Sequence, residues 1–292
     1  MSYTNEQKSF ISFRNNLKIF YQSWKKTDAK RVLVIQHGFG EHSDRYKNLL
    51  DKLKDSDFNI YALDSRGHGR SEGIRGHVEQ FQYYVDDLSH LIHIAQEENN
   101  AKKIFLLGHS LGGVIALQYS LELNNQDYLH ALLLSAPGLK VKMDLEKEVK
   151  KIAARYLAVL MPDFVLDANL DVNFLSHDKA VIDAYNKDPL VHGKISFQMA
   201  NNLFHLSHAL YKKAHRLTAP VFLMHGDADG IVDVRGSIEL EKALSSAQVS
   251  LKVYPGLYHE MMNEPPESRE KVLDDLKYFI DSIVPESKPV SS

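Results

Sequence analysis

The 292-residue sequence contains no cysteine. This absence excludes disulfides, thiolate metal sites and a cysteine nucleophile, so covalent catalysis would have to use oxygen or nitrogen. The sequence also lacks a strong excess of one charge, since 35 basic and 38 acidic residues give a formal net charge of -3. We therefore expect no concentrated basic surface of the kind that binds nucleic acids.

Long apolar runs are missing as well. No stretch approaches the roughly 18 consecutive apolar residues of a membrane-spanning helix, and the first residues lack the basic segment and apolar run of a secretory signal. We therefore expect a cytoplasmic protein. A composition of 44% hydrophobic and 25% charged residues is typical of a folded globular chain. Its length suits one domain that carries an insertion.

Short apolar segments alternate with helical patterns along most of the chain. Buried strands are predicted at 32–35, 59–63, 103–107, 131–134 and 221–224, and a last strand at 249–254. Helices are predicted at 43–55, 78–98, 111–123 and from Pro265 or Pro266 to 283. This alternation predicts an α/β fold with a mostly parallel central sheet covered by helices on both faces. Residues 8–26 predict an antiparallel hairpin that turns at Asn15 and Asn16.

About 80 residues without a clear strand separate the strands at 131 and 221, which is more than one crossover helix needs. We predict a helical cap at 139–214, inserted between core segments 1–138 and 215–292. One cap helix is expected around 145–159 and a second over 194–213. The first is amphipathic, which fits either packing on its own domain or a lid that touches lipid or a membrane surface.

The segment 108–112, Gly-His-Ser-Leu-Gly, matches the pattern G-x-S-x-G. Such a short match arises by chance, so its setting carries the inference. An apolar strand precedes the segment and a helical pattern follows it, which predicts a sharp turn that exposes Ser110 above the sheet. Ser110 is the predicted nucleophile; the alternative is a structural serine in a glycine-rich turn.

A serine nucleophile needs a base, and in hydrolases with this architecture the chain order is serine, acid, histidine. His259 follows the last predicted strand and precedes the last helix, so it is the predicted base. His109 is expected to point away from the site. His37 and His225 stand at strand ends, where structural hydrogen bonds would explain them.

Three carboxylates follow the strand at 221–224, and they compete for contact with the histidine. Asp233 precedes a helical pattern and suits a helix cap, and Asp227 suits the bracing of its own turn. Asp229 is therefore the predicted acid, with a solvated loop carboxylate as the alternative.

Two backbone N–H groups are the expected donors to an oxyanion, those of Leu111 and Phe39. The segment around Phe39 could instead be only a tight turn. No H-E-x-x-H motif and no Walker A lysine occur in the sequence, so neither a metal nor a cofactor is predicted.

Several segments together resemble one known family. They are 37–43 with 45–46, 64–73, the turn at 108–113, 188–191, 226–229 and 258–259. Over roughly residues 28–282 the chain resembles the monoglyceride lipase and lysophospholipase branch of the α/β hydrolases. The resemblance implies an α/β-hydrolase fold and a cap with an apolar tunnel for an acyl chain.

The same resemblance implies a serine hydrolase that cleaves monoacylglycerols to fatty acid and glycerol through an acyl-enzyme. It places Glu41 and Arg45 around the glycerol part of the substrate; the alternative is a surface ion pair. A lysophospholipase, a general carboxylesterase or a thioesterase would use the same triad, and a binding protein that kept the fold is the non-enzymatic alternative. The expected partner is a small lipid ester, with transient membrane contact through the cap as an option.

Overall fold

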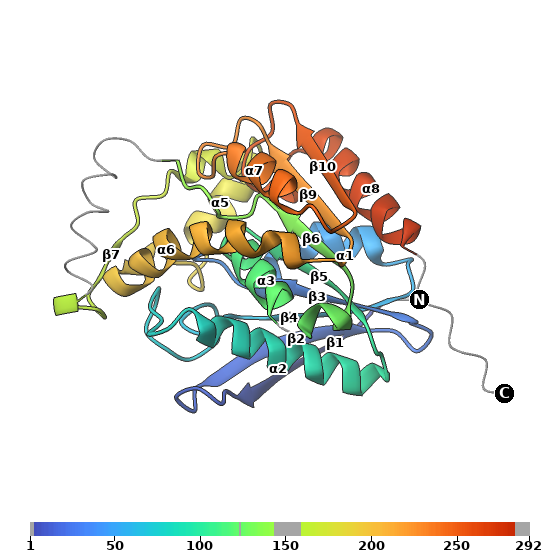
Figure 1. The fold of residues 1–292 in the computed structure, drawn as a ribbon, viewed down its shortest axis with the longest axis horizontal. Helices are drawn as coiled ribbons and strands as arrows, with labels where there is room; N and C mark the ends of the chain where they lie inside the picture. The colour runs from blue at the N-terminus through green and yellow to red at the C-terminus, as the bar shows by residue number, and fades with distance from the viewer. Residues whose placement is uncertain (1–2, 123, 143–158, 284–292) are drawn as a thin grey trace.

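The computed structural model describes residues 3–122, 124–142 and 159–283. Its main sheet has eight strands: β1 (Thr4–Ile11), β2 (Lys18–Lys25), β3 (Arg31–Gln36), β4 (Phe58–Leu63), β5 (Ile104–His109), β6 (Leu129–Ser135), β9 (Val221–Gly226) and β10 (Val249–Tyr254). They lie side by side in the order β1-β2-β4-β3-β5-β6-β9-β10 (Figure 1). The first two pairings are antiparallel and the others are parallel. The predicted fold class is confirmed.

Side chains of the central strands alternate between two apolar layers, as the period of an extended strand requires. In β3, Val32 and Val34 pack into one layer, whereas Leu33 and Ile35 pack into the other. Both faces of these strands are buried, which explains why their sequences are continuously apolar rather than alternating.

Helices cover both faces of the sheet (Figure 1). The core helices are α1 (Lys47–Leu53), α2 (Gln82–Asn99), α3 (Leu111–Leu121), α7 (Arg235–Ala243) and α8 (Pro266–Ser282). Buried residues of α2, α3 and α7 belong to one apolar layer, and those of α1 and α8 to the other. Short 3-10 turns complete the core: η1 (Ser43–Tyr46), η2 (Asn125–Tyr128) and η5 (Met261–Asn263). Proline at the start of α8 confirms the predicted helix start.

The predicted hairpin is also present. β1 and β2 pair from Thr4 with Lys25 to Ile11 with Lys18. Asn15 and Asn16 in the connecting turn have φ of 61° and 53°, the left-handed conformation that tight hairpin turns require and that asparagine tolerates.

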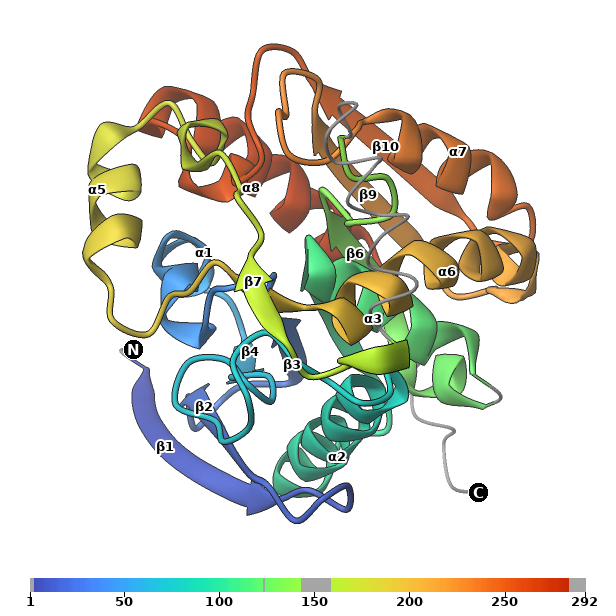
Figure 2. The ribbon, with the colours of Figure 1, turned by 90° about the vertical axis from the view of Figure 1, so that its left-hand side faces the viewer.

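The inserted region lies at one end of the sheet (Figure 2). Its described elements are β7 (Val165–Asp167), η3 (Val172–Phe174), α5 (Lys179–Lys187), β8 (Lys194–Ser196), α6 (Phe197–Lys213) and η4 (Ala214–Arg216). β7 and β8 form a small antiparallel pair that the sequence did not predict, because three residues are too few to establish a pattern. Most of the helix expected at 145–159 lies outside the described residues.

Hydrogen bonds join the second half of this insertion to the loops of the core. His192 Nε2 donates to the Gly67 carbonyl over 3.0 Å, and the Ser196 N–H donates to the Gly76 carbonyl. His42 Nε2 lies 2.9 Å from a carboxylate oxygen of Asp188. The insertion is therefore held at the edge of the sheet where β3, β4 and β5 end. In the described part of the chain, no helix has both the length and the apolar content that would let it cross a bilayer.

Candidate active site

Ser110 occupies the sharp turn between β5 and α3. Its φ of 51° and ψ of −120° are rarely adopted by residues with a side chain, so the turn is strained. The flanking glycines permit close packing, because a Cβ on Gly108 would lie 2.4 Å from the Gly112 carbonyl oxygen. Helix α3 begins at the next residue, Leu111, so the positive end of its dipole adjoins the turn. The predicted strand, turn and helix are confirmed.

His259 and Asp229 come together from two different loops. Asp229 follows β9, His259 follows β10, and His259 Nδ1 lies 2.6 Å from Asp229 Oδ2. The other carboxylate oxygen, Oδ1, accepts hydrogen bonds from the N–H groups of Ile231 and Val232. Both interacting side chains are almost fully buried. This carboxylate therefore fixes the imidazole in one orientation.

The two competing carboxylates bind elsewhere. Asp227 Oδ1 accepts a 2.6 Å hydrogen bond from the Gly256 N–H, so it braces the neighbouring loop rather than its own turn. Asp233 accepts from the N–H and the guanidinium of Arg235 at the start of α7, which agrees with the predicted capping position. The geometry thus favours Asp229 as the partner of His259.

Asp229 and His259 shift the pKa values of each other. Burial alone would raise the pKa of Asp229. The charge of the adjacent His259, together with the hydrogen bonds that Asp229 accepts from His225 and His259, holds that pKa well below the usual aspartate value. Burial would lower the pKa of His259, whereas Asp229, Glu260 and Glu41 together raise it above the usual histidine value. A proton taken up by His259 is therefore stabilised in this site.

Ser110 and His259 line one pocket. Three side chains of the insertion, Leu170, Leu175 and Tyr185, line the same pocket. None of the hydrogen bonds among the described residues joins Ser110 Oγ to His259; such bonds are often long before a substrate is bound. The predicted nucleophile and the predicted base therefore share one pocket.

The loop after β3 brings Phe39 next to the turn at Ser110. A Cβ on Gly38 would lie 3.0 Å from Ser110 Cβ and 2.9 Å from Glu41 Oε1, so only glycine fits there without a shift. Glu41 Oε1 accepts the Gly38 N–H over 2.5 Å and fixes the loop. Within the described residues, no protein acceptor receives the N–H of Phe39 or of Leu111. Both amides are thus available to a developing oxyanion.

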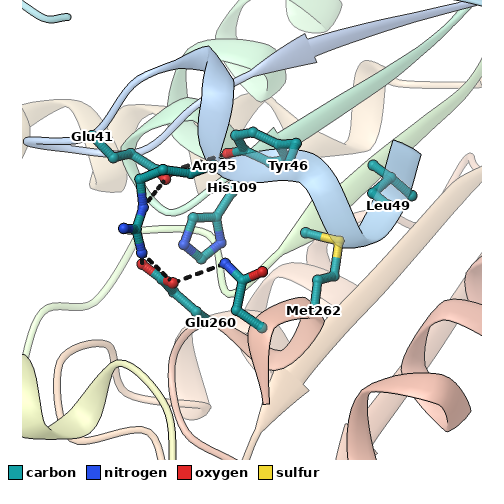
Figure 3. A pocket seen from close by; sticks show the side chains of 8 residues that line it. Glu41, Arg45, Tyr46, Leu49, His109, Glu260 and Met262 are labelled. Atoms are coloured by element: carbon teal, nitrogen blue, oxygen red, sulfur yellow. Dashed lines mark hydrogen bonds and ion pairs between the residues drawn. The ribbon is translucent and has the colours of Figure 1, made fainter. Parts of the chain in front are cut away.

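Glu41, Arg45 and Glu260 form a buried polar cluster near His109 (Figure 3). Arg45 donates to Glu41 over 3.3 Å and makes two 2.6 Å bonds to the carboxylate of Glu260. Tyr46 donates to Glu41 over 3.0 Å. The side chains of Arg45 and Glu41 are 9% and 5% exposed, so the alternative of a surface ion pair is wrong.

Two features of this cluster differ from expectation. His109, expected to point away from the site, lines the same pocket as Ser110, and its ring centroid lies 4.8 Å from that of His259. That expectation was based on the turn alone, whereas the loop after β10 places His259 beside His109. Glu260 was missed, although its position next to His259 in the sequence was a usable signal.

The insertion also contacts the loop that carries His259. The His259 N–H donates to the Phe174 carbonyl over 3.0 Å, and the Glu260 N–H donates to the Leu175 carbonyl over 2.8 Å. The Phe174 ring packs so closely on Gly230 that a Cβ there would lie 2.2 Å from it. The insertion therefore helps to position the loop that carries His259. Among the described residues, no group of three or more histidine or carboxylate side chains is arranged to hold a metal ion.

Comparisons with known proteins identify the family of the chain. Residues 27–266 match the family described as serine aminopeptidase, S33. The chain is 37% identical over 282 residues to a monoacylglycerol lipase of Mycolicibacterium smegmatis, covering 96% of this chain and 98% of that protein. It is 32% identical over 268 residues to the human monoglyceride lipase, covering 90% and 86% of the two chains.

A solved structure is similar over nearly the whole chain. It is a soluble variant of the monoglyceride lipase from Saccharomyces cerevisiae, in complex with a substrate analog. The TM-score is 0.86 at 25% sequence identity, and the match covers 98% of this chain and 97% of that one. The similarity therefore includes the inserted region as well as the sheet.

Proposed function

Because the chain belongs to the family described as serine aminopeptidase, S33, and to the monoglyceride lipase branch of the α/β hydrolases, we propose that it hydrolyses monoacylglycerols to fatty acid and glycerol. It is a serine ester hydrolase. One observation carries the proposal: Ser110 lines a pocket together with His259, the partner of buried Asp229, and with Leu170, Leu175 and Tyr185 of the insertion.

In the proposed reaction, Ser110 Oγ attacks the ester carbonyl while His259 takes the hydroxyl proton. Asp229 keeps the imidazole oriented and stabilises the imidazolium that forms. The N–H groups of Phe39 and Leu111 donate to the oxyanion of the tetrahedral intermediate. The strained turn at Ser110 supports this assignment because it holds the nucleophile at the start of α3.

The intermediate then collapses, and His259 gives its proton to the departing glycerol oxygen. Water enters, His259 removes one of its protons, and the resulting attack releases the fatty acid and restores Ser110. This sequence of steps needs no cofactor.

The residues that line the pocket suggest how a monoacylglycerol would lie. Leu170, Leu175 and Tyr185 offer an apolar surface for the acyl chain. Glu41 lines the same pocket, and Arg45, which donates to Glu41, lines a second pocket that shares Glu41 with it. Hydroxyl groups of glycerol would find charged partners there. Burial of these two charges next to the nucleophile supports a substrate with a polar alcohol part.

A release assay tests the proposal. Monoacylglycerols of several chain lengths are compared with lysophosphatidylcholine and acyl-CoA, using the wild-type protein and Ser110→Ala. We expect fastest turnover of a monoacylglycerol and a loss on the order of 10⁴-fold in Ser110→Ala. Equal or faster turnover of lysophosphatidylcholine or acyl-CoA contradicts the monoacylglycerol assignment and favours a lysophospholipase or thioesterase.

We also propose a cytoplasmic site of action, with transient contact between the insertion and lipid surfaces. Exposed apolar side chains near the described start of the insertion support the contact: Val159 is 81% exposed and Leu160 is 76% exposed. Flotation with liposomes tests it, with Val159→Ser/Leu160→Ser as the comparison. Absence of wild-type protein from the lipid fraction contradicts the proposed contact.

A further inference from the structure

His225, the last-but-one residue of β9, lies against the carboxylate that orients the base. Its Nε2 is 3.3 Å from Asp229 Oδ2 and 3.3 Å from the Val232 carbonyl oxygen. Its Nδ1 is 2.7 Å from Ser237 Oγ in the first turn of α7. The side chains of His225, Asp229 and Ser237 are almost completely buried. The proposed reaction leaves this ring without a function.

The contacts of the ring determine which nitrogen carries the proton. A carbonyl oxygen can only accept, so the contact with Val232 requires a proton on Nε2. Nδ1 then accepts the hydroxyl proton of Ser237. In this tautomer the protonated Nε2 also lies 3.3 Å from Asp229 Oδ2, the oxygen that binds His259. Oδ2 of Asp229 therefore lies between two imidazole rings.

We propose that His225 is a positioning residue for the proposed reaction, and that it holds Asp229 Oδ2 toward His259 while Ser237 fixes its own tautomer. Each carboxylate oxygen of Asp229 then has its own partners: backbone N–H groups contact Oδ1, and the two histidines contact Oδ2. A carboxylate held at both oxygens cannot rotate away when the charge on His259 changes during the reaction.

The inference rests on the proposed function, because it concerns the acid of the proposed triad. His225 does not line the pocket beside Ser110, so its replacement should change kcat and leave KM nearly unchanged. A donor on Asp229 also makes that carboxylate less basic. Loss of this donor should therefore make Asp229 more basic, and a more basic Asp229 should raise the pKa of His259.

Two polar substitutions separate the two contacts of the ring. In His225→Gln the side-chain amide reaches the position of Nε2, so it can donate to Asp229 but loses Ser237. In His225→Asn it reaches the position of Nδ1, so it keeps Ser237 but cannot reach Asp229. We expect kcat of His225→Gln within about threefold of wild type and kcat of His225→Asn lower by on the order of tenfold, the effect of one hydrogen bond to a charged group.

The pH profile gives a readout that a merely structural function would not change. His259 faces Asp229, Glu41, Glu260 and His109, and these groups are the same in both variants. His225→Asn should move the acid limb of kcat/KM to higher pH, whereas His225→Gln should leave it in place. Ser237→Ala should lower kcat less than His225→Asn does. Ser120→Ala removes an equally buried helical serine hydroxyl as the control.

The outcomes distinguish the two proposals. Wild-type protein without ester hydrolysis contradicts the proposed function, whatever the variants do. Active wild-type protein with equal kcat and equal acid limbs in His225→Asn and His225→Gln overturns the inference about His225. Nitrogen-15 NMR of labelled histidine in wild-type protein tests the tautomer without any substitution, and a proton on Nδ1 of His225 at neutral pH would also overturn it.

Discussion

At the scale of single residues, the two carboxylate oxygens of Asp229 have different partners. Oδ1 closes the loop after β9 through backbone N–H groups, and Oδ2 serves the imidazole of His259. Asp227, two residues earlier, accepts a hydrogen bond from the N–H of Gly256 in the loop after β10. The two aspartates thus offer a matched pair of substitutions in one loop.

Asp229→Asn should reduce kcat/KM by on the order of 10⁴-fold, because an amide neither fixes the required tautomer of His259 nor stabilises its charged form. Asp227→Asn should stay within a few-fold of wild type, since its amide oxygen still accepts the Gly256 N–H. Ester hydrolysis rates of the two purified variants check this prediction. A larger loss in Asp227→Asn would mean that the acid is assigned to the wrong residue.

The pH dependence of the reaction follows from the raised pKa of His259. His259 works as a base only when neutral, so kcat/KM should fall as the pH drops through that pKa, with a midpoint above the usual value of about 6.5. Glu260→Gln removes one of the charges that raise this pKa, and it should shift the midpoint to lower pH. A pH series of kcat/KM measures both.

Glu239→Gln is the control for that shift. Glu239 lies on α7, where it pairs with Lys140, and it is not among the groups that act on His259. Its replacement should leave the midpoint unchanged. A midpoint that moves upward in Glu260→Gln, or not at all, would show that Glu260 does not act on the base.

At the scale of elements, the site depends on how closely α3 approaches β3. A Cβ on Gly112 would lie 2.1 Å from the Gln36 carbonyl oxygen and 2.4 Å from that of His37. These are backbone atoms at the start of the loop that carries Phe39. The packing of one helix against one strand end thus determines the distance between the nucleophile and one proposed oxyanion donor.

Gly112→Ala should therefore reduce the free energy of unfolding by about 3 kcal/mol, at the upper end for overpacked positions, and should lower kcat as well. Gly256→Ala is the comparison, because Gly256 has φ of +75° but open space around it. It should cost only about 1 kcal/mol through backbone strain. Urea unfolding of both variants measures the difference, and equal losses would contradict the importance of the α3–β3 contact.

Much of this arrangement was predictable from the sequence for definite physical reasons. Buried parallel strands are continuously apolar, and their carboxyl ends share one edge of the sheet. Ser110 and Asp229 follow such strands, and His259 follows the parallel edge strand β10, so their approach could be expected. Asp233 was separable from Asp229 because helix capping is a local interaction, whereas the contact of Asp227 with Gly256, 29 residues away, was not predicted.

The rest depended on contacts between segments far apart in the chain. The bond from the His259 N–H to the Phe174 carbonyl involves backbone atoms, which no side-chain pattern records. The inward position of His109 follows from the loop after β10, not from β5 itself. The partnership of Arg45 with Glu260 joins residues 215 positions apart.

At the scale of the whole molecule, neutral histidines gather where the insertion meets the core. His37 and His68 follow β3 and β4, His192 belongs to the insertion, and the rings of His68 and His192 lie 4.7 Å apart. Burial lowers the pKa of His37 and of His192 to about 4, and it lowers that of His68 well below the usual value. The folded protein thus excludes protons that the unfolded chain would bind.

This difference predicts a stability that falls as the pH drops from about 6.5 toward 4. In that window the unfolded chain binds protons at these histidines and the folded chain does not, so unfolding becomes more favourable. A fully buried histidine with a pKa of about 4 would contribute a loss of about 2 kcal/mol between pH 7 and 5. His259, whose pKa is raised, acts in the opposite direction and offsets part of the loss.

His192→Gln tests this prediction at the junction itself. Its amide can still donate to the Gly67 carbonyl, but it does not titrate, so the variant should lose less stability than wild type between pH 7 and 5. The gain should stay below about 2 kcal/mol, because the ring of His192 is partly exposed and solvent screens it. Urea unfolding at both pH values measures it, with His93→Gln on the exposed face of α2 as the control. Equal losses in wild type and His192→Gln would show that the junction histidine does not contribute to the acid sensitivity of the fold.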